Sequence, residues 1–239
     1  MPGPPHPSFY HCWRTRLGPV PAAALAGLSG GERARWARFH AAGAQQAYAG
    51  AHLFVRAVLG HYVGQPPAAL VFGADARHKP ALLTTQPLWF NLSYRAQWAV
   101  LAVSDAGEVG VDVEEIKPVA GAAALVEQLF SPVEQAALGH CTGAAWWALF
   151  YAIWTRKEAW AKLLGMGLNL PFAGFSVVAR AAPTAWQVPA PGWLGKFAPD
   201  AAHVGALAVR LPPAAGPPVA WQHFTYPHLS PTAAGNLLA

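Results

Sequence analysis

Charged residues are scarce in this sequence. Only 11% of its 239 residues are Asp, Glu, Lys or Arg, against roughly 25% in a typical globular protein, and 54% are apolar. A chain with so much apolar surface to bury is not intrinsically disordered over its whole length. The 11 acidic residues are outnumbered by 16 basic ones, and the net charge of +5 favours an anionic ligand or an acidic partner protein.

Cysteines and long apolar runs are also few. Cys12 and Cys141 belong to no Cys-x-x-Cys pattern, so neither a disulfide framework nor a zinc site is expected. The longest purely apolar run, residues 144–154, is well short of the about 20 residues that span a bilayer. The first seven residues contain no apolar signal-peptide core. We therefore expect a cytoplasmic protein with no membrane partner.

Runs of Lys and Arg are missing as well, and no recognised nucleic-acid-binding motif accompanies the positive charge. Nucleic acid is therefore not expected as a partner. A basic nucleic-acid-binding protein stays a distant alternative, which salt-dependent DNA binding would support.

Cap and turn signals predict helices and strands in the first half of the chain. Ser29 and Glu32 have the spacing of a capping box, which predicts a helix carrying Arg33, Arg35, Arg38 and Phe39. A second helix is predicted over about 44–61 from its apolar spacing. Strands are expected within residues 9–20 and at 70–72, 89–94 and 98–103.

The second half repeats this order of helices followed by strands. Helices are predicted over about 120–130, from Ser131 onward and over about 144–164, and strands at 110–114, 172–179, 204–210 and 220–226. The turn at 104–107 is the expected boundary between an N-terminal subdomain, residues 1–107, and a C-terminal one, residues 108–239. The predicted fold class is α+β.

Two short stretches carry the candidate chemistry. In residues 110–114 the apolar Val111 and Val113 alternate with Asp112 and Glu114, which predicts a strand with both carboxylates on one face. A solvated strand edge would show the same alternation.

The second stretch, residues 154–162, reads as a helix with Glu158 and Lys162 one turn apart on the same side. If this helix faces the acidic strand, three carboxylates and a lysine converge. Such a cluster repels itself unless a hard cation sits inside it, so the pattern favours Mg²⁺ and a phosphate-containing substrate. The alternative is an ordinary surface pair of Glu and Lys.

Both stretches resemble motifs of the 4′-phosphopantetheinyl transferases, specifically the pseudo-dimeric class that activates peptide and polyketide synthases. The acidic strand resembles the family's G-(V/I)-D-(V/I)-E, and the helix resembles W-(S/T)-x-K-E-(A/S)-x-x-K. Three further matches occur in the family's order, at residues 79–80 (the end of G-K-P), 90–94 (F-N-(L/I)-S-H) and 130–134 (F-(S/x)-x-x-E). The resemblance covers roughly residues 29–226.

The resemblance implies an enzyme that transfers 4′-phosphopantetheine from coenzyme A to a serine of an apo acyl or peptidyl carrier protein, releasing adenosine 3′,5′-bisphosphate. It also implies two similar α/β subdomains that form a pseudo-dimer, with the active site in the cleft between them, and we expect a monomer. A protein of the same fold that binds coenzyme A or a nucleotide without transfer is the alternative.

The resemblance also assigns roles to residues. The Mg²⁺ ligands would be Asp112, Glu114 and Glu158, and Lys162 would contact the pyrophosphate. The catalytic proton acceptor would be Glu158, Glu134 or a metal-bound water, although Ser131-x-x-Glu134 is also the spacing of a structural capping box. Coenzyme A contacts are expected from Arg35, Arg77, Lys79, Pro80, Ser93, Tyr94, Lys157 and Lys162.

The sequence departs from the family's pattern at the nucleotide end. Glu32 stands where a basic residue is common, His78 replaces a glycine, and Tyr94 replaces the usual histidine. A tyrosine donates one hydrogen bond but carries no positive charge. The pocket for the 3′-phosphate is therefore the part of the site about which the resemblance implies least.

Overall fold

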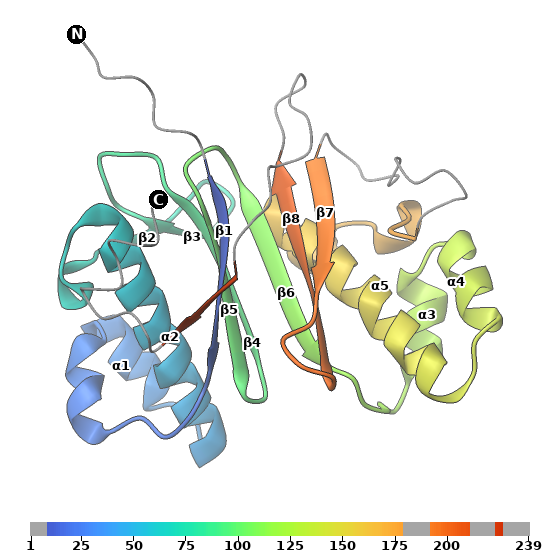
Figure 1. The fold of residues 1–239 in the computed structure, drawn as a ribbon, viewed down its shortest axis with the longest axis horizontal. Coiled ribbons are helices and arrows are strands. Elements are labelled where there is room, and N and C mark those ends of the chain that lie inside the picture. The colour runs from blue at the N-terminus through green and yellow to red at the C-terminus, as the bar shows by residue number, and fades with distance from the viewer. Residues whose placement is uncertain (1–8, 179–191, 211–222, 227–239) are drawn as a thin grey trace, which may run out of the picture.

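The computed structural model describes residues 9–178, 192–210 and 223–226. These residues form four layers, with two sheets in the middle and helices on the outer face of each sheet (Figure 1). The mixture of helix and sheet confirms the predicted α+β class. No helix in the described ranges is long and apolar enough to cross a membrane.

The first sheet and its helices come mainly from the N-terminal part of the chain. They consist of β1 (Tyr10–Arg16), α1 (Gly30–Trp36), α2 (Ala42–Val63), β4 (Trp89–Arg95) and β5 (Trp98–Ser104). Between α2 and β4, β2 (Phe72–Ala74) and β3 (Pro80–Leu82) form a separate two-stranded sheet. The second sheet and its helices comprise β6 (Val109–Glu115), α3 (Ala122–Leu129), α4 (Pro132–Gly139), α5 (Gly143–Leu164), β7 (Gly192–Phe197) and β8 (His203–Arg210).

The strand order places β4 and β6 at the edges of their sheets. The first sheet has the order β4-β5-β1-β9 and the second β6-β8-β7. Strand β9 (His223–Tyr226) pairs in parallel with β1. The chain thus returns from the second sheet to the first, across the expected boundary at residue 107, and the division into residues 1–107 and 108–239 stays a prediction.

Three clusters of buried side chains hold the layers together. One cluster lies between the sheets and combines Cys12 and Val100 of the first sheet with Val111 and Val209 of the second. The other two join each sheet to its own helices. The aromatic residues of α5 belong to the cluster of the second sheet and its helices, rather than to the contact between the halves.

Both predicted capping boxes are present. The Ser29 and Ser131 side chains accept a hydrogen bond from the backbone three residues ahead, and the glutamates at those positions bond back to the serine amides. Helix α1 ends at Trp36, so Arg38 and Phe39, which were expected on it, lie beyond its end.

The strand predicted at 172–179 is wrong for its described part. Residues 172–174 form a short 3₁₀ helix, and no strand runs through residues 172–178. The backbone here bonds to buried side chains instead of to a sheet, because Lys157 donates to two of its carbonyls and Glu134 accepts from one of its amides.

Strand β7 was missed because its glycines are typical of a loop. A Cβ at Gly192 would lie 2.4 Å from the Trp160 ring, and one at Gly195 would lie 2.0 Å from the Trp193 ring. These glycines therefore make room for indole rings and do not break the strand. The Pro-rich residues 1–8 predict a loose arm, and the last ten residues are likewise expected to be loose; both segments lie outside the described residues.

Candidate active site

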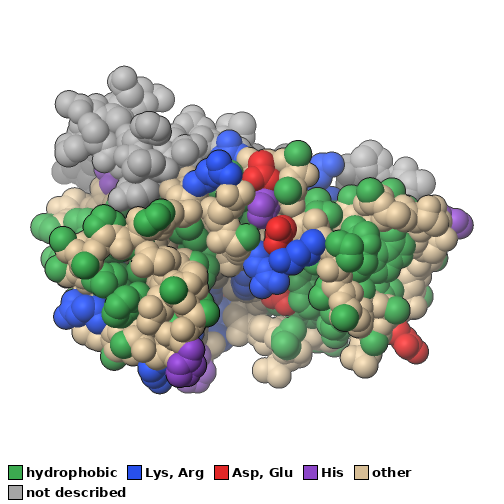
Figure 2. All heavy atoms as spheres, turned by 90° about the horizontal axis from the view of Figure 1, so that it is seen from below, with side chains coloured by type: hydrophobic (Ala, Val, Ile, Leu, Met, Phe, Trp, Pro, Cys, Tyr) green, Lys and Arg blue, Asp and Glu red, His purple; other side chains and the backbone are tan. Residues whose placement is uncertain are grey.

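The two sheets are joined along their edge strands by side chains of β4 that reach β6. Asn91 accepts a hydrogen bond from the β6 backbone at 2.8 Å, and Ser93 donates to Asp112 Oδ1 at 2.9 Å. Arg95 forms an ion pair with Glu114 at 3.0 Å. Residues two apart on a strand share a face, so these three contacts form one row, which we call the β4–β6 seam. Seen from below, basic and acidic side chains gather in the middle of the molecule (Figure 2).

Helix α5 lies directly on the acidic strand. A Cβ at Gly110 would lie 2.0 Å from the carbonyl oxygen of Ala159, so only glycine allows this approach. The helix thereby brings Glu158 and Lys162 to the acidic face of β6. The Lys162 ammonium lies 2.6 Å from Asp112 Oδ1, which confirms that the predicted helix faces the predicted strand.

The three carboxylates at this place interact with one another. Burial raises the pKa of Glu114, and Asp112 and Glu158 add to the rise while Arg95 and Lys162 oppose it. Burial likewise raises the pKa of Glu158, with Lys162 opposing and Asp112 adding. The other oxygen of Asp112, Oδ2, is buried and has no hydrogen-bond partner in the described residues. The site therefore has negative charge and a free acceptor to offer.

The side chains of this site do not form a complete set of metal ligands in this arrangement. Within residues 9–178, 192–210 and 223–226, no three His, Cys, Asp or Glu side chains lie close enough together to hold a metal ion. Lys162 and Arg95 are the cations that pair with Asp112 and Glu114 here. A metal would have to replace part of these contacts.

Glu134 and Lys157 lie elsewhere, in the core between α4 and α5. Both side chains are 0% exposed, and Lys157 Nζ lies 2.9 Å from Glu134 Oε2. Lys157 also donates to the carbonyls of Phe172 and Phe175, while Glu134 accepts from the amide of Val177. Glu134 and Lys157 thus form a buried pair away from Asp112, and their expected roles in catalysis and in coenzyme A contact stay predictions. The capping box expected from the spacing of Ser131 and Glu134 is present.

Arg77 and Lys79 tie the two sheets together at the start of β6. Arg77 pairs with Glu108 and donates to the Leu164 carbonyl at the end of α5. Lys79 Nζ donates to the Val109 carbonyl at 2.6 Å. Burial, aided by the charge of Arg77, lowers the pKa of Lys79 to about 8. Both side chains, expected to contact coenzyme A, are thus bonded to the protein itself.

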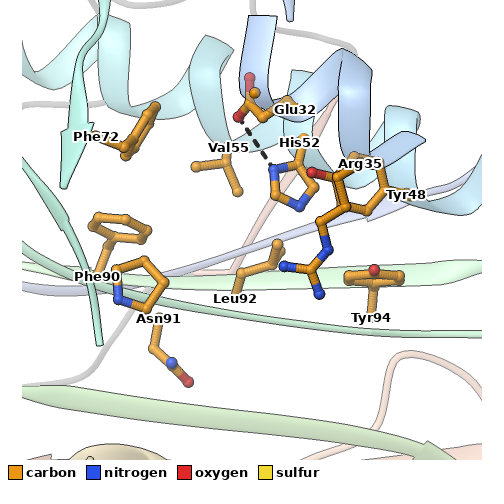
Figure 3. A pocket seen from close by; sticks show the side chains of 12 residues that line it. Glu32, Arg35, Tyr48, His52, Val55, Phe72, Phe90, Asn91, Leu92 and Tyr94 are labelled. Atoms are coloured by element: carbon orange, nitrogen blue, oxygen red, sulfur yellow. Dashed lines mark hydrogen bonds and ion pairs between the residues drawn. The ribbon is translucent and has the colours of Figure 1, made fainter. Parts of the chain in front are cut away.

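A pocket of about 550 Å³ opens on the other face of β4, below α1 and α2. Arg35 reaches from α1 toward β4 beside Tyr94 (Figure 3), and its guanidinium lies 5.8 Å from the ring centre of Tyr48. Pro80 also lines this pocket. Among the expected coenzyme A contacts, these three (Arg35, Tyr94 and Pro80) come together, whereas Ser93 faces the seam.

Glu32 forms a charged network at the edge of this pocket. It pairs with Arg56 at 2.8 Å and with His52 at 3.2 Å. Burial would raise the pKa of Glu32, but hydrogen bonds from His52, the Ser29 amide and Arg56 outweigh it and bring the pKa to about 2. Its carboxylate is therefore ionised at neutral pH and is bound within the protein.

We expect Glu32→Gln to reduce stability at neutral pH and to flatten its dependence on acid. A folded-state pKa of about 2, against an ordinary 4.5, stabilises the fold above pH 4.5, and this contribution is lost as pH falls toward 2. We expect a loss of about 1–2 kcal/mol, less than the shift alone implies because the site is partly open to water. Thermal unfolding between pH 2.5 and 7 measures it.

Glu127→Gln is the matched control, because Glu127 is an exposed carboxylate on α3. Equal unfolding temperatures for the Glu32→Gln variant and the native chain at pH 7 would contradict the role given to this network.

Sequence reasoning missed Asn91, His52 and Arg95. A signal existed for two of them, since Asn91 and Arg95 lie two residues to either side of Ser93, Asn91 on the predicted strand 89–94 and Arg95 one position past its end. His52 and Arg56 are four apart on α2, but nothing local links them to Glu32.

Comparison with known proteins identifies the family of this chain. The model of the 4′-phosphopantetheinyl transferase superfamily matches residues 108–215, which include β6 and α5. The 4′-phosphopantetheinyl transferase HetI of Nostoc is 30% identical over 221 residues, covering 87% of this chain and 92% of its own length. A 4′-phosphopantetheinyl transferase of Bacillus subtilis is 32% identical over 154 residues, covering 64% and 67%. AcpT of Escherichia coli is 39% identical over 110 residues, covering 46% and 55%. The chain therefore belongs to the 4′-phosphopantetheinyl transferase superfamily, whose enzymes transfer 4′-phosphopantetheine.

Proposed function

We propose that this chain transfers 4′-phosphopantetheine from coenzyme A to a serine of an apo acyl or peptidyl carrier protein, with Mg²⁺ at Asp112, Glu114 and Glu158. The observation that carries the proposal is the contact of α5 with β6, which places Lys162 at 2.6 Å from Asp112. This acidic and basic group adjoins the strand whose other face lines the pocket. Carboxylates that could bind a metal, a lysine that could bind phosphate and a pocket that could hold a nucleotide thus lie together.

The residues present fit a Mg²⁺ ion. The ion takes about six oxygen ligands and commonly combines one or two carboxylates with substrate phosphates and water. Asp112 Oδ2 is a buried acceptor with no partner in the described part of the chain, and the charges of Asp112 and Glu158 both act on the Glu114 carboxylate. Bound there, Mg²⁺ would neutralise charge on the pyrophosphate oxygens.

The transfer forms a bond between the serine oxygen of the carrier and the phosphorus that bears pantetheine. The bond from that phosphorus to the bridging oxygen breaks, and its electron pair leaves on adenosine 3′,5′-bisphosphate. Lys162 and Ser93 lie 3.1 Å apart and both can donate to phosphate oxygens, so they would hold the leaving group. Of the side chains considered as acceptors of the serine proton, Glu158 lies at the site, and burial raises its pKa.

The pocket beside Arg35 suits the nucleotide end of coenzyme A. Tyr48, Tyr94 and Phe90 offer aromatic surface for the adenosine, and Arg35 offers charge for the 3′-phosphate. Strand β4 is an edge strand, so a ligand that crosses its free edge reaches both the pocket and the seam. Because both sheets that form this site come from one chain, we also propose that the enzyme works as a monomer. We further propose that it is located in the cytoplasm.

Arg35→Ala is expected to raise the KM for coenzyme A about tenfold or more, because a charge-assisted hydrogen bond to the 3′-phosphate is lost. The KM for 3′-dephospho-coenzyme A should change little. Steady-state kinetics with both donors measure the difference, and Arg38→Ala, an exposed arginine just after α1, is the control. Equal losses with both donors would place Arg35 away from the 3′-phosphate.

The proposed function is tested with purified protein, coenzyme A, Mg²⁺ and a panel of apo carrier proteins of fatty-acid, polyketide and peptide synthases. Intact-mass measurement should show the gain of one phosphopantetheine group on at least one carrier. No gain on any of them would overturn the proposal. Tight binding of coenzyme A without turnover would support the alternative of a binding protein, which the pairing of Asp112 and Glu114 with resident cations favours.

A further inference from the structure

We propose that Arg95 is a resident counter-ion of the metal site, which occupies Glu114 until a divalent cation displaces it and thereby sets the metal concentration that the enzyme needs. The inference rests on the proposed metal site. It concerns a residue that lies one position beyond the matched motif at 90–94.

Backbone pairing fixes the position of Arg95, so only its side chain can move. Its position in β4 is fixed by pairing with Trp98 of β5, next to a tight turn in which Ala96 has a φ of 50°. As the third residue in the row with Asn91 and Ser93, it points to β6. The guanidinium can therefore swing without any movement of the strand.

The contact with Glu114 is one that a metal can replace. The Arg95 side chain is 53% exposed and Glu114 is 19% exposed, with Nε lying 3.0 Å from Oε2. In the described residues, Glu114 is the ion-pair partner of Arg95. Because the Arg95 partner is exposed to water, the pair is weaker than a buried one, so a divalent cation can break it.

The charges around Glu114 assign this task to Arg95 and not to Lys162. Asp112 and Glu158 repel the Glu114 carboxylate, and both cations attract it. Lys162 is already held by Asp112 at 2.6 Å and by Ser93. Arg95 is thus the cation that directly covers Glu114, and a positive charge about 3 Å from a ligand oxygen opposes an incoming Mg²⁺.

Neutralising Arg95 should therefore tighten metal binding. We expect Arg95→Gln to lower the dissociation constant for Mn²⁺, used as a probe for Mg²⁺, about three- to tenfold. Arg95→Lys, which keeps the charge, should stay within about twofold of the native value. The measurement is a Mn²⁺ titration followed by electron paramagnetic resonance, with the full chain and without coenzyme A.

Arg16→Gln is the matched control. Arg16 is an exposed arginine on β1 that donates to Gln97 in the turn after β4, so its substitution removes the same charge close by without touching Glu114. It should leave the dissociation constant unchanged. If Arg16→Gln lowered the dissociation constant for Mn²⁺ by a comparable factor, the effect would be due to net charge alone, and the proposal would be overturned.

Unchanged or weaker Mn²⁺ binding by Arg95→Gln would overturn the inference, as would transfer activity in a chain that binds no Mn²⁺. Loss of affinity for coenzyme A in Arg95→Gln at saturating metal would also overturn it, because Arg95 would then be a phosphate contact. The Mn²⁺ titration requires neither a carrier protein nor the transfer of phosphopantetheine. A failed mass assay would therefore overturn the proposed function, while the titration decides the role of Arg95.

Discussion

Asp112→Asn is expected to reduce the rate of phosphopantetheine transfer about a thousandfold while the chain stays folded. The substitution removes the negative charge that meets Lys162 at 2.6 Å and replaces the oxygen Oδ2, which has no partner in the described part of the chain. Asp112 would hold the Mg²⁺ and Lys162 that neutralise charge on the pyrophosphate, and the loss of such neutralisation lowers rates on this scale. Intact-mass time courses with a carrier protein measure the rate, and thermal unfolding checks the fold.

The control for this prediction lies on the same strand. Glu115→Gln removes a carboxylate whose side chain is 33% exposed and pairs with Lys117 beside it. We expect this variant to keep transfer within about twofold. Transfer by Asp112→Asn at a rate near that of the native chain would remove the acidic strand from the mechanism.

The acidic strand and the helix above it were predictable because their signals are local. The alternation around Asp112 and the one-turn spacing of Glu158 and Lys162 depend on backbone periods of two and 3.6 residues. Even the packing of the helix on the strand has a local sequence signal, because Gly110 is the position where α5 approaches β6 most closely.

The positions of Lys157 and Glu134 were not predictable in the same way. Lys157 is adjacent to Glu158 in sequence, but successive residues of a helix point about 100° apart, so one faces the seam and the other the core. The partner of Lys157 is 23 positions away, a separation that carries no periodic signal. The same pair explains the wrong strand at 172–179, whose backbone groups it binds.

The nucleotide pocket shows another limit of prediction from the sequence. Glu32 was seen as an acidic replacement in a basic pocket, yet its carboxylate is bound by Arg56 and His52 and is part of the pocket wall. Its charge is therefore compensated within the protein and does not simply repel a phosphate. Such compensation depends on contacts between separate helices, which residue spacing does not reveal.

Lys157→Met is expected to lower the free energy of unfolding by about 3–5 kcal/mol, because it leaves the Glu134 carboxylate buried without its partner. Both side chains are 0% exposed, so water cannot replace the lost contact. The double variant Glu134→Gln/Lys157→Met should be less destabilised than Lys157→Met alone, since no unpaired charge remains in the core. Chemical denaturation of the three variants, including Glu134→Gln, measures these differences.

The activity of Glu134→Gln separates a structural role from a catalytic one. At a temperature where the variant stays folded, we expect kcat within about threefold of the native value, because the carboxylate bonds to Lys157 and Val177 in the core. A residue that accepts the proton of the attacking serine would lose at least about a hundredfold. A loss of that size, in a variant that denatures like the native chain, would return Glu134 to the reaction. A loss of stability with kcat preserved would leave Glu158 as the proton acceptor contributed by a side chain of the site.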